Sequence, residues 1–95
     1  MAFLVKIRYL AVLKGLAKEP EKTVELEGRS LADLLALLKN SEDPILKARF
    51  FNEGEGIRPD VLIFVNDVDS SLLGGSNAEL KDGDEVVFLP SVHGG

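Results

Sequence analysis

The chain contains 95 residues, of which 45% are hydrophobic and 28% charged, which suits one folded domain and leaves no room for two. Its 16 acidic and 11 basic residues give a net charge of −5, which argues against direct binding to nucleic acid, and the absence of cysteine excludes disulfides and thiolate metal sites. No apolar stretch approaches the roughly 18 residues of a membrane span and no signal-peptide pattern opens the chain, so we expect a cytoplasmic protein without membrane contact.

The first 28 residues predict a β-hairpin with a short helical turn inside it. Apolar and polar side chains alternate over residues 3–9, which is typical of a strand with one buried face. The alternation is lost over residues 11–17, where we expect a helical turn that stops near Gly15 and Pro20. Alternation returns over residues 23–27, which should form the returning strand, and Gly28 closes it.

The main helix is predicted from residue 31 to about residue 40. Ser30 can cap its start and Asp33 stands in the capping-box position three residues later. The apolar stripe has the i, i+3, i+4, i+7 spacing of a helix and consists of Leu31, Leu34, Leu35 and Leu38. A second start signal that ends at Pro44 predicts another helical turn over residues 44–50, followed by an exposed loop over residues 52–56.

The C-terminal third predicts two more strands. The apolar run 61–65 indicates a central strand that is covered on both faces, and we place it in the middle of the sheet. Gly74 and Gly75 predict an unusual turn, and Ser76 repeats the capping-box spacing before Leu80. Residues 81–84 should form a turn before a last strand over residues 85–89, which Pro90 ends.

These elements predict an α+β domain in which one main helix packs on one face of a mixed sheet. We expect the domain to span residues 1–90 and a flexible tail to span residues 91–95. The last strand has two alternating faces, of which only one can be core, and its outward side is our candidate for a partner surface. The sequence does not assign Val87 and Phe88 to these faces.

The tail ends in Val92-His93-Gly94-Gly95, which could carry the chemistry of the protein. A terminal carboxyl has a pKa of about 3.3 to 3.7, so Gly95 presents an anionic oxygen that could attack the α-phosphate of ATP and form an acyl-adenylate. Glycine lacks Cβ, so Gly94 lets the backbone enter a narrow catalytic channel. Many proteins end in small residues, however, and the dipeptide by itself favours no function.

The sequence around these elements resembles two sister families. Residues 58–69, then Leu72-Leu73-Gly74 and the final His93-Gly94-Gly95, resemble the ubiquitin-related modifier, a sulfur carrier for tRNA thiolation. Residues 8–17 and 23–26, with the leucine-rich helix after them, resemble the small subunit of molybdopterin synthase. Both are ubiquitin-like sulfur carriers with a β-grasp fold, so the resemblance implies this fold for the α+β domain.

The resemblance implies a carrier that other proteins act upon. A ubiquitin-activating-type enzyme would consume ATP to adenylate Gly95, and a sulfur donor would convert the adenylate into a thiocarboxylate. The sulfur would pass to a tRNA-thiolating enzyme or to the large subunit of molybdopterin synthase, and the same activated end could be conjugated to lysines of target proteins. The chain itself would bind no cofactor and would not be an enzyme, except as a subunit of molybdopterin synthase.

Other chemical sites are weaker. His93 is the only histidine, and one imidazole on a tether is a poor metal ligand set, so we expect it to contact the activating enzyme. The spacing of Asp67 and Asp69 suggests calcium, but the glycine and the distal glutamate of a calcium loop are missing. Three interpretations stay open: the tRNA-thiolation carrier, the molybdopterin-synthase subunit, and a binding module whose tail is never activated.

Overall fold

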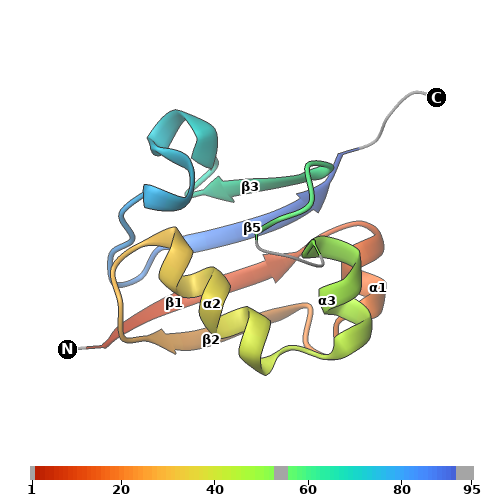
Figure 1. Cartoon of the computed structure of the whole chain (residues 1–95). Helices are drawn as coiled ribbons and strands as arrows, with labels where there is room; N and C mark the ends of the chain where they lie inside the picture. The colour runs from red at the N-terminus through yellow and green to blue at the C-terminus, as the bar shows by residue number, and fades with distance from the viewer. Residues whose placement is uncertain (1, 53–55, 92–95) are drawn as a thin grey trace.

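A mixed five-stranded sheet with strand order β2-β1-β5-β3-β4 forms the frame of this computed structural model, which describes residues 2–52 and 56–91. The helices lie against one face of the sheet (Figure 1). The α+β prediction, with a mixed sheet covered on one face, is therefore confirmed. The sheet uses β1 (Phe3–Tyr9), β2 (Glu21–Leu26), β3 (Val61–Val65), β4 (Val68–Asp69) and β5 (Glu85–Pro90).

The N-terminal hairpin forms as its alternating pattern predicts. β1 and β2 pair antiparallel, and the inward side chains of β1 are Val5, Ile7 and Tyr9, each at most 1% exposed. The short helix α1 (Val12–Leu16) belongs to the connection from β1 to β2 and buries Leu13 against the core. It extends one residue beyond the predicted stop at Gly15, because an α-helix of this length can tolerate glycine near its end.

The main helix, α2 (Leu31–Ser41), begins at the predicted cap. The Ser30 hydroxyl accepts a hydrogen bond from the Asp33 amide at 3.2 Å, and the Asp33 carboxylate accepts one from the Ser30 amide at 3.1 Å. The backbone hydrogen bonds from Ser30 and Arg29 lower the pKa of Asp33. The helical turn predicted over residues 44–50 is also confirmed as α3 (Pro44–Phe50), with Asp43 as its cap.

The placement of the apolar run 61–65 in the middle of the sheet is wrong. β5 occupies the centre, where it pairs parallel with β1 and antiparallel with β3. β3 has only the two-residue β4 on its other side, and its burial alternates, with Leu62 and Phe64 half-buried. Helices cover one face of the sheet, so the outward apolar side chains of β3 belong to a surface.

The repeated capping-box spacing that begins at Ser76 lies in the segment between β3 and β5. Ser76 caps no α-helix, since residues 75–77 form a short 3₁₀ turn and Glu79 bridges to Ser30. The capping-box spacing fails here because no amphipathic run follows Ser76. The predicted glycine turn is confirmed, because Gly74 and Gly75 have positive φ angles of 103° and 62° that bulkier residues rarely adopt.

The core is centred on three aromatic rings from three separate elements. Tyr9, Phe50 and Phe88 are at most 1% exposed, and their ring centroids lie 5.3 to 5.9 Å apart. The Tyr9 hydroxyl donates a hydrogen bond to the Glu42 carboxylate, which also accepts one from Lys22 Nζ at 2.7 Å. The Glu42 carboxylate thus links the C-terminal end of α2 to both strands of the hairpin.

Tyr9 should remain protonated in alkaline solution for as long as the domain is folded. Burial and then the Glu42 carboxylate raise the pKa of Tyr9 far above its ordinary value of about 10. The folded state therefore binds more protons than the unfolded state above about pH 10, so stability should fall there with rising pH. Because Tyr9 is the only tyrosine, tyrosinate absorbance reports it alone.

The measurement is an absorbance titration of the native protein and of the protein in denaturant. The denatured chain should titrate near pH 10, whereas the native signal should appear only as the protein unfolds. In the Tyr9→Phe variant, this fall in stability at alkaline pH should be absent. A native titration near pH 10 without unfolding would contradict the prediction.

Candidate functional site

The structure shows where the chain leaves the sheet toward the predicted Gly-Gly end, but it does not describe that end itself. Gly95, Gly94 and His93 lie outside the described residues, so their assigned roles stay predictions, as does the domain boundary after residue 90. The last described residue is Ser91, directly after β5. Its amide and its hydroxyl both donate to the Asp60 carbonyl oxygen, at 2.6 and 3.1 Å.

The structure assigns the two faces of β5. Phe88 points into the core with 0% exposure, whereas Val87 lies on the opposite face of the sheet, which the helices do not cover. This open-face side of β5 is the surface that the sequence indicated without assigning residues to it. The sequence missed its partners on β3, although the alternation of Leu62 and Phe64 with buried valine and isoleucine carries the signal.

Five apolar side chains gather on this face and are here called the open-face patch. They come from β3, β5 and the residue that follows β1, and they line or adjoin a hollow of about 300 Å³. The register places Leu62 beside Leu89 and Phe64 beside Val87. The patch consists of Leu10, Leu62, Phe64, Val87 and Leu89, and Arg8 and Asp67 lie at its border.

The other half of the open face is charged. Lys6 and Arg8 from β1 face Glu21 and Glu85 at N–O distances of 3.8 to 4.0 Å. Such exposed pairs contribute little to stability, on the order of 0 to 1 kcal/mol each. They do divide the face into two regions, because β5 begins at Glu85 in the charged region and reaches the patch at Val87. The apolar region is thus at the end of β5 from which the tail departs.

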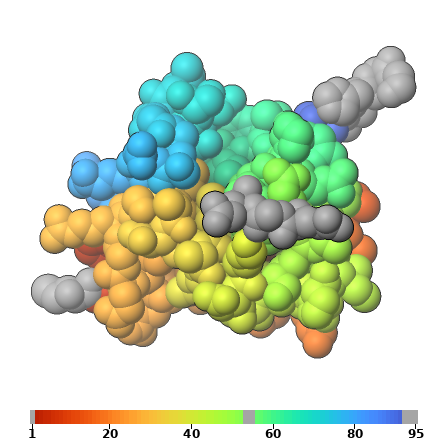
Figure 2. Space-filling model, in the orientation of Figure 1, coloured from red at the N-terminus to blue at the C-terminus, as the bar shows by residue number. Residues whose placement is uncertain are grey.

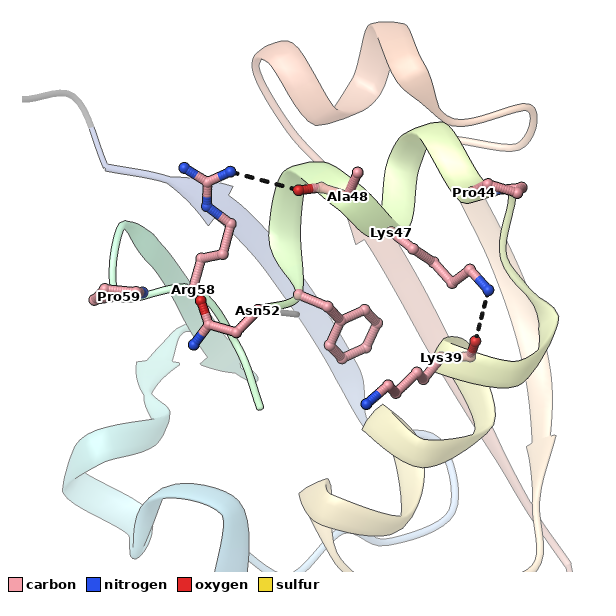
Figure 3. A pocket seen from close by; sticks show the side chains of 8 residues that line it. Lys39, Pro44, Lys47, Ala48, Asn52, Arg58 and Pro59 are labelled. Atoms are coloured by element: carbon pink, nitrogen blue, oxygen red, sulfur yellow. Dashed lines mark hydrogen bonds between the residues drawn. The ribbon is translucent and has the colours of Figure 1, made fainter. Parts of the chain in front are cut away.

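A basic hollow of about 640 Å³ lies on the helical side of the molecule, the side that faces the viewer in Figure 2. Its cations, Lys39, Lys47 and Arg58, come from α2, α3 and the segment before β3 (Figure 3). Lys47 Nζ donates to the Lys39 carbonyl at 3.1 Å, and Arg58 Nη1 donates to the Ala48 carbonyl at 3.4 Å. These contacts connect neighbouring elements and give the hollow a structural role.

Neither a metal centre nor a membrane helix is found in residues 2–52 and 56–91. No group of three metal-ligating side chains gathers there, and no helix in this part of the chain is long and apolar enough to cross a bilayer. Asp69, which the calcium spacing includes, accepts a hydrogen bond from the Ser71 amide at 2.9 Å and begins the 3₁₀ turn Ser70–Leu73. That bond lowers the pKa of Asp69.

Residues 4–95 match the family model described as Urm1 (Ubiquitin related modifier). The chain belongs to the ubiquitin-related modifier family. Among the curated members, ubiquitin-related modifier 1 of Coprinopsis cinerea is 44% identical over 66 residues, covering 67% of this chain and 53% of that protein. The Gallus gallus protein is 40% identical over 65 residues, covering 66% and 64%. The matched segment therefore spans about half to two thirds of these relatives.

Solved structures support the same family and confirm the β-grasp prediction. The small archaeal modifier protein 1 of Methanosarcina acetivorans has a TM-score of 0.84 and 30% identity, covering 100% of this chain and 99% of that chain. A chain in the Amycolatopsis orientalis BexX/CysO complex has a TM-score of 0.72 and 32% identity, covering 96% and 99%. The domain thus has the ubiquitin-like fold of the modifier family to which the chain belongs.

Proposed function

We propose that this protein is a ubiquitin-like sulfur carrier whose terminal Gly95 is adenylated, converted into a thiocarboxylate and used to donate sulfur for tRNA thiolation. The observation that carries the proposal is the family match, which runs through residue 95 and so includes the Gly-Gly end. The same activated carboxyl would form an isopeptide bond if a lysine of a target protein attacked it.

The chemistry is divided between the chain and its partners. Gly95 supplies the carboxylate, Gly94 gives access to the partner's active site, and His93 contacts the activating enzyme. That enzyme, of the ubiquitin-activating type, consumes the ATP, and a sulfur donor supplies the sulfur. The chain binds no cofactor and makes no direct contact with nucleic acid, so the tRNA-thiolating enzyme receives the sulfur and holds the tRNA.

The open-face patch is the surface that we assign to the activating enzyme. An interface core is typically apolar with a polar rim, and the patch has this pattern, with Arg8 and Asp67 at its border. It lies on the strand whose end carries the tail, so a partner that covers Leu89 is close to the chain that it must modify. The CysO-like neighbour named above was solved in a complex, which supports docking by a domain of this kind.

The proposal is tested with the purified protein, a ubiquitin-activating-type enzyme, ATP and a sulfur donor. Intact-mass measurement should show the increase of one oxygen replaced by sulfur, confined to the C-terminal peptide. An unchanged mass in the presence of an enzyme that activates a related modifier would count against it. Stable binding to a molybdopterin-synthase large subunit, with sulfur transfer to the pterin precursor, would instead favour the alternative carrier role.

A negative charge in the open-face patch should weaken docking without unfolding the domain. The Leu89→Asp variant places a carboxylate where an apolar contact is expected, and loss of a central contact costs about 2 kcal/mol or more, or roughly thirtyfold in affinity. The KM for the carrier in adenylation should rise by about that factor while kcat changes little.

The matched control for this prediction is Thr23→Asp, which adds the same charge to the same face of the sheet. Thr23 is exposed on β2 and lies outside the patch. The KM of this control should stay within about threefold of that of the unmodified protein, since isolated surface charges have small effects. Equal increases in KM for both variants would show that the patch is not the docking surface.

A further inference from the structure

Asp60 connects Ser91, here called the root of the tail, to the helical side of the domain. Its backbone carbonyl and its side-chain carboxylate make the two contacts. Its carbonyl oxygen accepts both hydrogen bonds from Ser91, at 2.6 and 3.1 Å. Its carboxylate pairs with Arg49 on α3 at 3.2 Å and with Arg58 at 3.4 Å. The carboxylate is only 24% exposed, so both guanidinium groups are near it in a sheltered position.

The segment that carries Asp60 is itself held from both sides. The Arg58 amide donates to the Phe50 carbonyl at 2.9 Å, and the Val61 amide donates to the Arg58 carbonyl at 3.0 Å. Val61 then pairs with Pro90 at the end of β5. Proline has no amide hydrogen, so at this end of the ladder the Ser91 bonds to Asp60 supply the donors that Pro90 lacks.

We infer that Asp60 is a positioning residue for the carrier terminus, because it fixes the point and direction at which the chain leaves the sheet. The inference rests on the proposed activation of Gly95. Four residues follow Ser91, so Gly95 can lie at most about 14 Å from this anchor. With so short a tether, the direction of the root decides which positions the reacting carboxylate can reach.

The expected effect is on the chemical step more than on docking. If the carboxylate is removed, Arg49 and Arg58 no longer hold the peptide that accepts from Ser91, and the anchor moves back along the chain toward Pro90. Ordering one additional backbone residue in the partner's active site lowers the rate about fivefold to thirtyfold. The Asp60→Ala variant should therefore show a kcat for adenylation about tenfold lower, with the KM for the carrier changed less than twofold.

The first arm of the test uses the free protein and does not depend on any partner. Amide hydrogen exchange at Ser91 should be at least about tenfold faster in Asp60→Ala than in the unmodified protein. The control is Asp33→Ala, which removes another structural carboxylate, at the start of α2, and leaves Asp60 intact. Unchanged exchange at Ser91 in Asp60→Ala would overturn the inference.

The second arm measures adenylation kinetics for three variants, Asp60→Ala, Asp33→Ala and Asp60→Asn, below their unfolding temperatures. Asp60→Ala should lower kcat, Asp33→Ala should not, and Asp60→Asn, which keeps an acceptor oxygen for the arginines, should recover part of the loss. An equal loss of kcat in Asp60→Ala and Asp33→Ala would show a merely structural effect and overturn the inference. If the unmodified protein is not adenylated at all, the proposed function fails, and the exchange at Ser91 still decides whether Asp60 fixes the root.

Discussion

Deletion of Gly94 and Gly95 is expected to abolish sulfur acquisition and to leave the folded domain unchanged. The new terminal carboxylate would belong to His93 and would end about 7 Å short of the original position. This new terminal residue would also carry an imidazole side chain at a point where access to a narrow channel favours glycine. Intact-mass measurement after incubation with the activating enzyme, ATP and a sulfur donor should show no thiocarboxylate.

The control for the truncation is Gly15→Ala, which alters a glycine far from the tail in sequence. A Cβ at Gly15 meets no atom within 4 Å, and alanine is the better helix former, so this variant should stay folded and active. The truncated protein should keep the same unfolding transition as the full chain. A truncated chain that still supports the cellular role would identify a binding module whose tail is never activated.

Substitution of Phe88 by alanine should lower the free energy of unfolding by about 3 to 5 kcal/mol, the usual cost of removing a buried phenylalanine ring. Phe88 is fully buried in the central strand, and its ring centroid lies 5.4 Å from that of Tyr9 and 5.3 Å from that of Phe50. Domains of this size are stable by only about 5 to 15 kcal/mol, so the loss is a large part of the total.

The matched control is Leu89→Ala, one residue further along the same strand. Leu89 faces away from the helices, in the open-face patch, so its truncation should cost about 1 kcal/mol or less. Equilibrium unfolding in urea, followed by circular dichroism, gives both values. Equal destabilisation by the two substitutions would contradict the assignment of Phe88 to the core and Leu89 to the surface.

Most of the fold could be predicted because the local signals agree with the tertiary structure. Ser30 and Asp33 form the capping box that their spacing indicates, and Asp43 with Pro44 starts the second helix. The alternation over residues 3–9 matches the burial of β1 residue by residue. In these segments the hydrophobic period and the capping residues point to the same element, so no long-range information is needed.

The sheet order and the open face could not be obtained in this way. An uninterrupted apolar run such as 61–65 is expected both for a strand covered on two faces and for a strand whose outer face binds a partner. The pairing of β5 with both β1 and β3 sets the sheet order, and the packing of helices on one face only separates these two cases. Both are long-range properties. The contact of Asp60 with Ser91 joins residues 31 positions apart and has no local signature either.

The position of β5 between β1 and β3 has a consequence for protein synthesis. A ribosome releases β1 before β5, so the sheet cannot be completed until residues 85–90 have emerged. Before that moment the hairpin and β3 have strand edges without a partner, which favour aggregation. An interrupted chain that lacks β5 would thus lack the complete sheet.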